Sequence, residues 1–228
     1  MSDDLVPGDE RIAIPIRATG YFRMHVPDKL PDGPAALLVA THGYRQPPQR
    51  MLEYAISVAP EDAIVIAPEG PSAFYGPRVR ERAIGRRIDY GWIADPRRPD
   101  SEKRNRDLIG QAFDYVEERH AIDPQRTWLR GFSLGVGVAV DFFVQNPERG
   151  AGIVGRAGGG PPHGRTAHKA LRDRGIFWHT GARDNDYTPE YEQTLLDCFD
   201  EAGVHVEALQ FDVGHNLLDE VQDAVYAW

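Results

Sequence analysis

Short apolar runs alternate with segments of helical periodicity along most of the chain, and this alternation restricts the possible fold more than any other feature. Residues 35–40 and 63–67 are continuous apolar runs, which fit strands buried on both faces. Between them, residues 49–58 have the spacing of an amphipathic helix. Strands that alternate with helices in this way form a mostly parallel sheet that is covered by helices on both faces.

The same alternation continues to the end of the chain. Residues 11–17 and 21–26 predict an antiparallel hairpin ahead of the parallel sheet. Ser101 can cap a helix that follows a long Pro-, Gly- and Arg-rich loop at 69–100. Further strands are expected at residues 127–132, 152–154, 175–179 and 204–211, and further helices at 134–145, between the Thr188 cap and Gly203, and at 217–228. Ligands of such sheets bind at the carboxyl ends of the strands.

The charge balance excludes several classes of partner. The 228 residues include 26 basic and 35 acidic side chains, a net charge of −9, so nucleic acid is not an expected ligand. No apolar run approaches the roughly 20 residues that span a bilayer, so no stable membrane insertion is expected. The acidic N-terminus lacks the apolar region of a signal peptide, and the one cysteine, Cys198, cannot form an intramolecular disulfide. We therefore expect one cytoplasmic domain over residues 1–228.

The segment Gly-Phe-Ser-Leu-Gly at residues 131–135 carries the sharpest chemical signal. It matches the G-x-S-x-G pattern and lies between a predicted strand and a predicted helix, which is the context that this pattern needs. Ser133 must then occupy a strained turn that lifts its hydroxyl out of the sheet. A side chain two positions before or after it would clash with the neighbouring strand and helix, so both positions are glycine. The pattern predicts that Ser133 is a nucleophile.

A serine hydroxyl is a weak nucleophile unless a base takes its proton and a third group orients that base. His215 fits the base best among the eight histidines, because it follows the last predicted strand and precedes the terminal helix. The acid should lie between the serine and the histidine along the chain. Asp184 and Asp186 both follow the strand at 175–179. Asp184 is preferred, and Asp186 stays open as the alternative.

Two backbone N–H groups are candidates for stabilising the oxyanion that a serine attack creates. The N–H of Leu134 lies at the N-terminus of the predicted helix, where unpaired donors and the helix dipole favour negative charge. The second donor should come from the loop after the strand at 35–40, which reads Thr-His-Gly-Tyr. Gly43 lets this backbone turn closely, so the N–H of Tyr44 can point at the oxyanion.

With these residues, the chain resembles the α/β-hydrolases, specifically the small serine carboxylesterase, phospholipase and dienelactone-hydrolase-like group. The resemblance covers residues from about 35 to 228 and rests on His42-Gly43, the segment 131–135, Gly181 with Asp184, and Gly214-His215. It implies a nucleophile at Ser133, an acid at Asp184, a base at His215, and oxyanion donors at Tyr44 and Leu134. Two departures leave the substrate open: Leu134 replaces the glutamine usual in small carboxylesterases, and Ser133 replaces the cysteine of dienelactone hydrolases.

The resemblance also suggests where a substrate would bind. The segment from Ala67-Pro68 through Trp92 resembles the family's loop that runs from a proline to a glycine and a tryptophan beside the acyl pocket. The stretch from 155 to 174 leaves little room for the helical cap of larger relatives, so we expect an open site walled by Gly159 and its neighbours, with His163 nearby. The arginines of the loop at 69–100 either pair with acidic surface groups or bind an anionic substrate group.

These expectations combine into a serine hydrolase that cleaves small carboxylic esters through an acyl-enzyme, without a metal or an organic cofactor. A thioesterase or a peptidase with the same three residues is the alternative among enzymes. A non-catalytic binding protein on the same scaffold is the alternative from another class, since a fold does not determine a function. The oligomeric state is left open, with a homodimer as one option.

Overall fold

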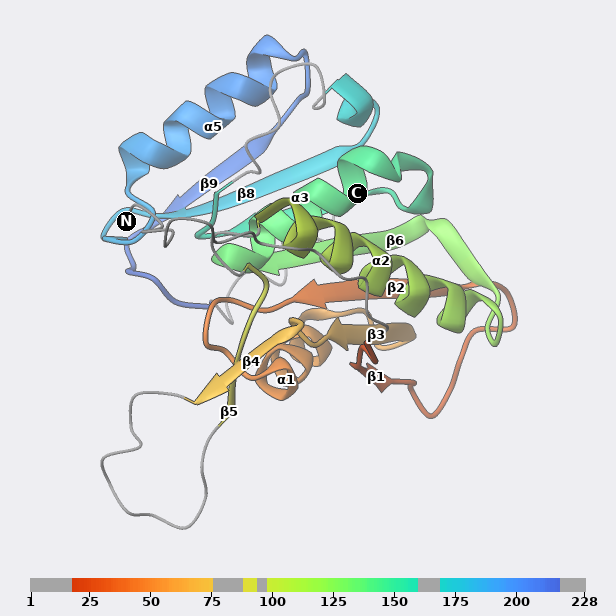
Figure 1. Ribbon diagram of the computed structural model, residues 1–228. Helices are drawn as coiled ribbons and strands as arrows, with labels where there is room; N and C mark the ends of the chain where they lie inside the picture. The colour runs from red at the N-terminus through yellow and green to blue at the C-terminus, as the bar shows by residue number, and fades with distance from the viewer. Residues whose placement is uncertain (1–17, 76–87, 94–97, 160–168, 218–228) are drawn as a thin grey trace, which may run out of the picture.

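One central sheet organises the molecule, as Figure 1 shows. The computed structural model describes residues 18–75, 88–93, 98–159 and 169–217. Seven strands pair in the order β1-β3-β2-β6-β7-β8-β9, and within this sheet only β1 runs antiparallel to its neighbour. The strands are β1 Phe22–His25, β2 Ala35–Thr41, β3 Ala63–Pro68, β6 Ile122–Phe132, β7 Gly152–Arg156, β8 Gly175–Gly181 and β9 Glu207–Phe211. The predicted mostly parallel sheet is confirmed.

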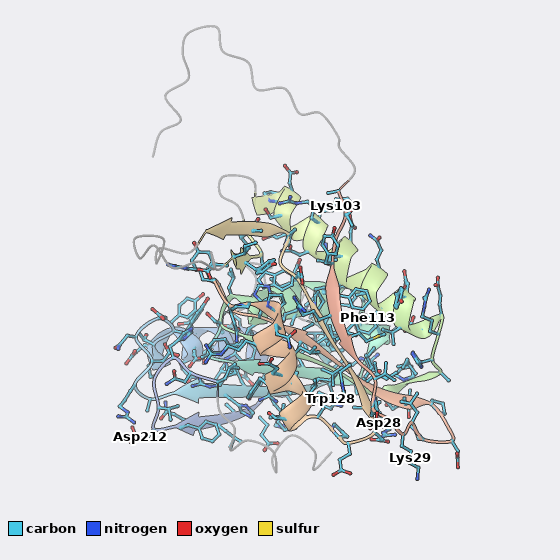
Figure 2. All side chains as sticks on the ribbon, turned by 90° about the horizontal axis from the view of Figure 1, so that it is seen from below. Asp28, Lys29, Lys103, Phe113, Trp128 and Asp212 are labelled. Carbon is cyan, nitrogen blue, oxygen red and sulfur yellow. The ribbon has the colours of Figure 1, made fainter. Side chains whose placement is uncertain are left out.

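Helices cover both faces of this sheet. They are α1 Pro48–Val58, α2 Arg98–Glu117, α3 Leu134–Gln145 and α5 Pro189–Glu201, with short 3-10 turns at Pro147–Arg149 and Lys169–Leu171. Met51 of α1 and Leu38 of β2 belong to a smaller core on one face, whereas α2, α3 and α5 share the larger core on the opposite face. Figure 2 shows Phe113 of α2 inside the molecule and Lys103 pointing away from it. The alternation of β2 and β3 side chains between the two cores explains their continuous apolar sequences.

Two helices follow their local sequence signals closely. The bounds of α3 agree with the apolar segment predicted at 134–145. The helix α5 starts after Thr188, whose hydroxyl accepts a hydrogen bond from the Tyr191 N–H at 3.4 Å, with Pro189 in the first turn. Gly203 follows the end of α5 with a φ of 73°, a conformation that glycine adopts without strain.

The segment predicted as a long loop at 69–100 contains regular structure. The strands β4 Ser72–Tyr75 and β5 Ile88–Gly91 pair antiparallel as a separate two-stranded sheet, which Figure 1 shows projecting from the body of the molecule. The helix α2 begins at Arg98, so Ser101 is buried inside its first turns and does not cap it. Pro99 is tolerated there because the first N–H groups of a helix have no partner within it.

Other bounds differ by a few residues, and some predictions cannot be compared. The strand β6 begins at Ile122, five residues before the predicted Thr127, and its pairing with β2 has a register irregularity at residues 35–37. The strand β9 begins at Glu207, three residues after the predicted start at residue 204. The first strand of the predicted hairpin and the helix from residue 218 onward lie outside the described residues. Within the described ranges, no helix combines the length and the apolar character that crossing a bilayer requires.

Candidate active site

Ser133 occupies the sharp turn between β6 and α3. Its backbone has a φ of 53° and a ψ of −125°, a combination that is sparsely populated by residues other than glycine. Such a residue costs on the order of 1–3 kcal/mol and persists only where its surroundings hold it. Here the Ser133 N–H donates to the Arg156 carbonyl, and the Ser133 carbonyl accepts from the Val136 N–H, both at 3.0 Å. The turn therefore has the strain that the sequence pattern predicted.

The glycines on either side of Ser133 allow the close packing of this turn. A Cβ on Gly131 would lie 2.5 Å from the Cα of Val136 at the start of α3. A Cβ on Gly135 would lie 2.6 Å from the carbonyl oxygen of His42, in the loop after β2. Both contacts are with backbone, which cannot move away. Glycine at both positions lets α3 start directly against the end of β2.

A hydrogen-bonded chain connects three residues from three different strand ends. His215, after β9, has its Nε2 at 2.9 Å from the Oγ of Ser133, after β6. The Nδ1 of the same ring lies 2.9 Å from an Oδ2 of Asp184, after β8. With the ring neutral and its proton on Nδ1, the ring donates to the carboxylate, and Nε2 accepts from the serine hydroxyl. This is the geometry that a base-activated serine requires.

The structure distinguishes between the two candidate aspartates. The Asp184 side chain is fully buried, and its Oδ1 accepts from the N–H groups of Asp186 and Tyr187, each at 2.9 Å. Burial on its own raises the pKa of Asp184, but the hydrogen bonds from Tyr187, His215 and Asp186 outweigh it and lower the pKa. The Asp186 side chain is 71% exposed, with an Oδ2 at 3.9 Å from the His215 Nε2. Asp184 is therefore the carboxylate that holds the ring.

These same residues also have the spacing of a metal site. Ligand atoms of Asp184, Asp186 and His215 lie within 4.8 Å of one another. However, the two ring nitrogens of His215 are already engaged with Ser133 and Asp184. An ion bound here would have to replace one of those hydrogen bonds, so metal binding and the hydrogen-bonded chain compete for the same atoms.

The loop after β2 lies against the nucleophile and is held by a buried histidine. A Cβ on Gly43 would lie 3.2 Å from the Cβ of Ser133. The His42 Nδ1–H donates to the Gly43 carbonyl at 2.8 Å, and its Nε2 accepts from the Gly70 N–H at 3.0 Å. Burial lowers the pKa of His42 to about 4, against a smaller opposing effect of the Gly43 bond, so the ring is neutral near pH 7. The loop that carries Tyr44 is thus fixed beside Ser133.

Comparisons with known proteins show a similarity of fold. No protein-family model matches the sequence, and no curated protein is similar to it. Several solved structures are similar in fold. Esterase PE8 has a TM-score of 0.68 at 16% identity, over 91% of this chain and 96% of that one. Acyl-protein thioesterase 2 of Zea mays has a TM-score of 0.66 at 15% identity, over 91% of this chain and 96% of that one. The Bacillus cereus carboxylesterase has a TM-score of 0.63 at 18% identity, over 91% of this chain and 92% of that one.

The chain has the α/β-hydrolase fold. In this fold the hydrogen-bonded chain lies at the carboxyl ends of β6, β8 and β9, where the parallel sheet presents its loops. Leu134 is the first residue of α3, so its N–H has no acceptor within the helix. The predicted oxyanion donors Tyr44 and Leu134 thus come from the two segments that meet at Ser133.

Trp92 has a different place in the hydrolase fold from the one expected. Its ring is fully buried and stacks on His42, with ring centroids 4.7 Å apart. Its indole N–H donates to the His42 carbonyl at 2.7 Å. A fully buried ring presents no surface to a ligand, so the expected substrate contact does not agree with this position. Trp92 instead supports the loop that carries Tyr44.

A cavity of about 190 Å³ opens beside the residue that follows the nucleophile. It is lined by Ile93, Glu102, Asn105, Leu134, Gly137, Val138, Asp141, Gly159, Tyr187 and Tyr191. Gly159, a predicted wall of the site, is among them, and a Cβ there would lie 2.9 Å from the Tyr191 hydroxyl oxygen. His163, the other predicted neighbour, lies outside the described residues. The hydrolase fold therefore provides a small cavity next to Leu134.

Sequence reasoning missed Tyr187. Its ring stacks on the His215 ring with centroids 5.8 Å apart and an interplanar angle of 18°. Its backbone N–H is one of the two donors that hold Asp184. The available signal was its position: it follows the acid by three residues and precedes the Thr188-Pro189 helix start.

The buried carboxyl of Glu192 in α5 makes the stability of the fold depend on pH. The residue is fully buried, and burial raises the pKa of its carboxyl to about 8, although the nearby charge of Arg156 opposes this. In the unfolded chain this carboxyl ionises near pH 4.5, whereas in the folded chain it keeps its proton until about pH 8. Its contribution to stability is therefore complete below about pH 4.5 and is lost as the pH rises toward 8.

Replacing Glu192 by glutamine should remove this pH dependence, because the amide imitates the protonated carboxyl and does not titrate. Between about pH 5 and about pH 8, the wild type should lose on the order of 3 kcal/mol relative to Glu192→Gln. Urea unfolding of both proteins at these two pH values measures the difference. An equal pH dependence of the two free energies of unfolding would contradict the raised pKa of Glu192.

Proposed function

We propose that this protein is a serine hydrolase that cleaves carboxylic esters of small molecules. The observation that carries the proposal is the hydrogen-bonded chain Ser133–His215–Asp184, with the serine on a strained turn at the centre of the sheet. The names of similar folds, which include an esterase, a carboxylesterase and an acyl-protein thioesterase, agree with this chemistry.

The proposed reaction begins when the Ser133 Oγ attacks the carbonyl carbon of the ester and His215 Nε2 takes the serine proton. Asp184 keeps the ring in the tautomer that can accept this proton and stabilises the imidazolium that forms. The oxyanion of the tetrahedral intermediate accepts hydrogen bonds from the N–H groups of Tyr44 and Leu134. As the carbon–oxygen bond to the alcohol breaks, His215 gives its proton to the departing oxygen. Water then repeats these steps on the acyl-enzyme and releases the acid.

We propose that the cavity beside Leu134 takes the acyl group of the ester. Leu134 and Val138 contribute aliphatic walls, and Tyr187 and Tyr191 contribute aromatic ones. The volume of about 190 Å³ supports short and medium acyl chains over long ones. Gly159 keeps this space open, because a side chain at that position would contact both tyrosines. The single domain, the cytoplasmic location and the homodimer stay predictions, as does the contact of His163.

Two assays test this proposal together. A panel of p-nitrophenyl esters from acetate to palmitate, with a thioester and a lysophospholipid, reports the substrate class, and a fluorophosphonate reports the nucleophile. We expect hydrolysis of the short and medium esters and stoichiometric labelling of Ser133. Faster turnover of the thioester would favour a thioesterase, and strong preference for palmitate would contradict the role of the cavity. Ser133 that stays unlabelled would favour a binding protein.

A further inference from the structure

Arg156, the last residue of β7, forms hydrogen bonds with three segments that end in the site. Its carbonyl accepts from the Ser133 N–H at 3.0 Å. Its guanidinium Nη2 donates to the Gly214 carbonyl at 3.0 Å, directly before His215. Its Nη1 donates to the His179 carbonyl at 3.2 Å, in the strand β8 that leads into the loop of the acid. One residue therefore connects the segments of the nucleophile, the base and the acid.

The loop that carries His215 has few other attachments to the sheet. The Arg183 N–H donates to the Val213 carbonyl at 3.0 Å. In the described residues after Val213, no further backbone-to-backbone hydrogen bond joins this loop to the sheet. The Asn216 N–H donates to the Gly214 carbonyl at 2.9 Å, which is a bond within the loop. The guanidinium of Arg156 is thus the group that fixes the Gly214 backbone to the body of the molecule.

We propose that Arg156 is a positioning residue of the proposed ester hydrolysis, on which this inference rests, and that its guanidinium holds the backbone before His215. Proton transfer requires the Ser133 Oγ and the His215 Nε2 to stay in hydrogen-bond contact, as their distance of 2.9 Å provides. A shift of Gly214 moves the neighbouring ring with it. A misplacement of about 1 Å can lower a rate by about 100-fold, even when the substituted residue lies away from the chemistry.

The surroundings of the guanidinium indicate that stability is not its main contribution. The residue is fully buried, and its Nε has no hydrogen-bond partner among the residues that the structure describes. Burial lowers the pKa of Arg156, against the opposing charges of Glu192 and Asp184, and an arginine still keeps its charge near pH 7. A buried charge with an unpartnered donor destabilises a fold. Bonds from a charged donor are strong, however, so the guanidinium holds its two acceptors firmly.

The fold should tolerate the loss of this group, because both acceptors keep another donor. The His179 carbonyl also accepts from the Ala157 N–H at 3.0 Å, and the Gly214 carbonyl keeps its bond from Asn216. Methionine at position 156 would fill much of the same buried space without a charge. What Arg156→Met removes is the bond between the sheet and the loop of the base.

Arg130→Met is the matched control for Arg156→Met. Arg130 is also a buried arginine, in the neighbouring strand β6, but its Nη2 donates to the Tyr54 hydroxyl at 2.6 Å and not to a loop of the site. We expect Arg156→Met to lower kcat by about 100-fold with little change in KM. Arg156→Lys should lower kcat by only about tenfold, because an ammonium can still bond to one of the two carbonyls. Arg130→Met should keep kcat within about threefold.

Thermal unfolding shows which variants are folded, and the NMR signal of the proton between His215 Nδ1 and Asp184 reports the ring position without a substrate. We expect exchange with water to remove this signal in Arg156→Met and not in Arg130→Met. A folded Arg156→Met with the kcat of Arg130→Met overturns the inference. Should Arg156→Met not fold, Arg156→Lys takes its place, and a wild-type kcat overturns the inference.

Failure of the proposed function gives a different result. If the folded wild type hydrolyses no ester, the proposed function fails, and the NMR signal then decides whether Arg156 positions His215. An equal signal in Arg156→Met and Arg130→Met, or in Arg156→Lys and the wild type if Arg156→Met does not fold, would exclude that role.

Discussion

Replacing Ser133 by alanine should lower kcat for ester hydrolysis by about 10⁴ to 10⁶. Alanine lacks the oxygen that attacks the carbonyl, and the described structure offers no second hydroxyl in hydrogen-bond contact with His215 Nε2. The His215–Asp184 bond stays intact in the variant, because it does not involve Ser133. Thermal stability should hardly change, since the Ser133 backbone is held by the Arg156 carbonyl and not by its side chain.

The measurement is steady-state hydrolysis of a short p-nitrophenyl ester, with thermal unfolding as the check of the fold. Ser57→Ala is a suitable control, because Ser57 of α1 bonds to the Tyr54 carbonyl and lies outside the proposed catalytic chain. Activity of Ser133→Ala within tenfold of the wild type would exclude a mechanism based on this serine.

Replacing Asp184 by asparagine should lower kcat by about 10⁴ and leave the fold intact. The N–H groups of Asp186 and Tyr187 still require an acceptor, so the amide oxygen of asparagine should take the place of Oδ1. The amide NH₂ then faces the His215 Nδ1 and donates to it. This fixes the ring with its proton on Nε2, which can no longer accept the Ser133 proton.

Asp186→Asn is the matched control for this substitution. The Asp186 carboxylate is 71% exposed and lies 3.9 Å from the ring, so its loss should leave kcat almost unchanged. Thr188 and not Asp186 provides the side-chain cap of α5, so stability should change little as well. Rates at several pH values should be compared for both variants. An inactive Asp186→Asn with an active Asp184→Asn would move the acid to position 186.

Local signals predicted the parts of the fold and of the site that depend on short stretches of chain. The elements at 35–41, 134–145 and 189–201 were found because apolar runs, a cap and a proline act within a few residues. Ser133 was found for the same reason, since the strand, the turn and the helix around it are adjacent in sequence. Chain order placed Asp184 and His215 after the correct strands.

The features that sequence reasoning missed depend on contacts between distant segments. The strands β4 and β5 are four residues long each and lie twelve residues apart, in a segment without periodicity. The burial of Trp92 depends on its contact with His42, fifty residues earlier in the chain. The stacking of Tyr187 depends on where the loop after β9 returns His215. Nothing in a single short segment reports such pairings.

Because of the strand order, the position of His215 in the site depends on a strand at the edge of the sheet. The nucleophile follows β6, which has three strands on either side of it in the sheet, whereas the base follows β9, which is an edge strand. Edge strands are paired on one side only, and proteins open locally at a lower free energy than they unfold as a whole. Fraying of β9 withdraws His215 while Ser133 stays in its strained turn. On heating, the loss of catalytic competence should therefore precede the cooperative melting of the core.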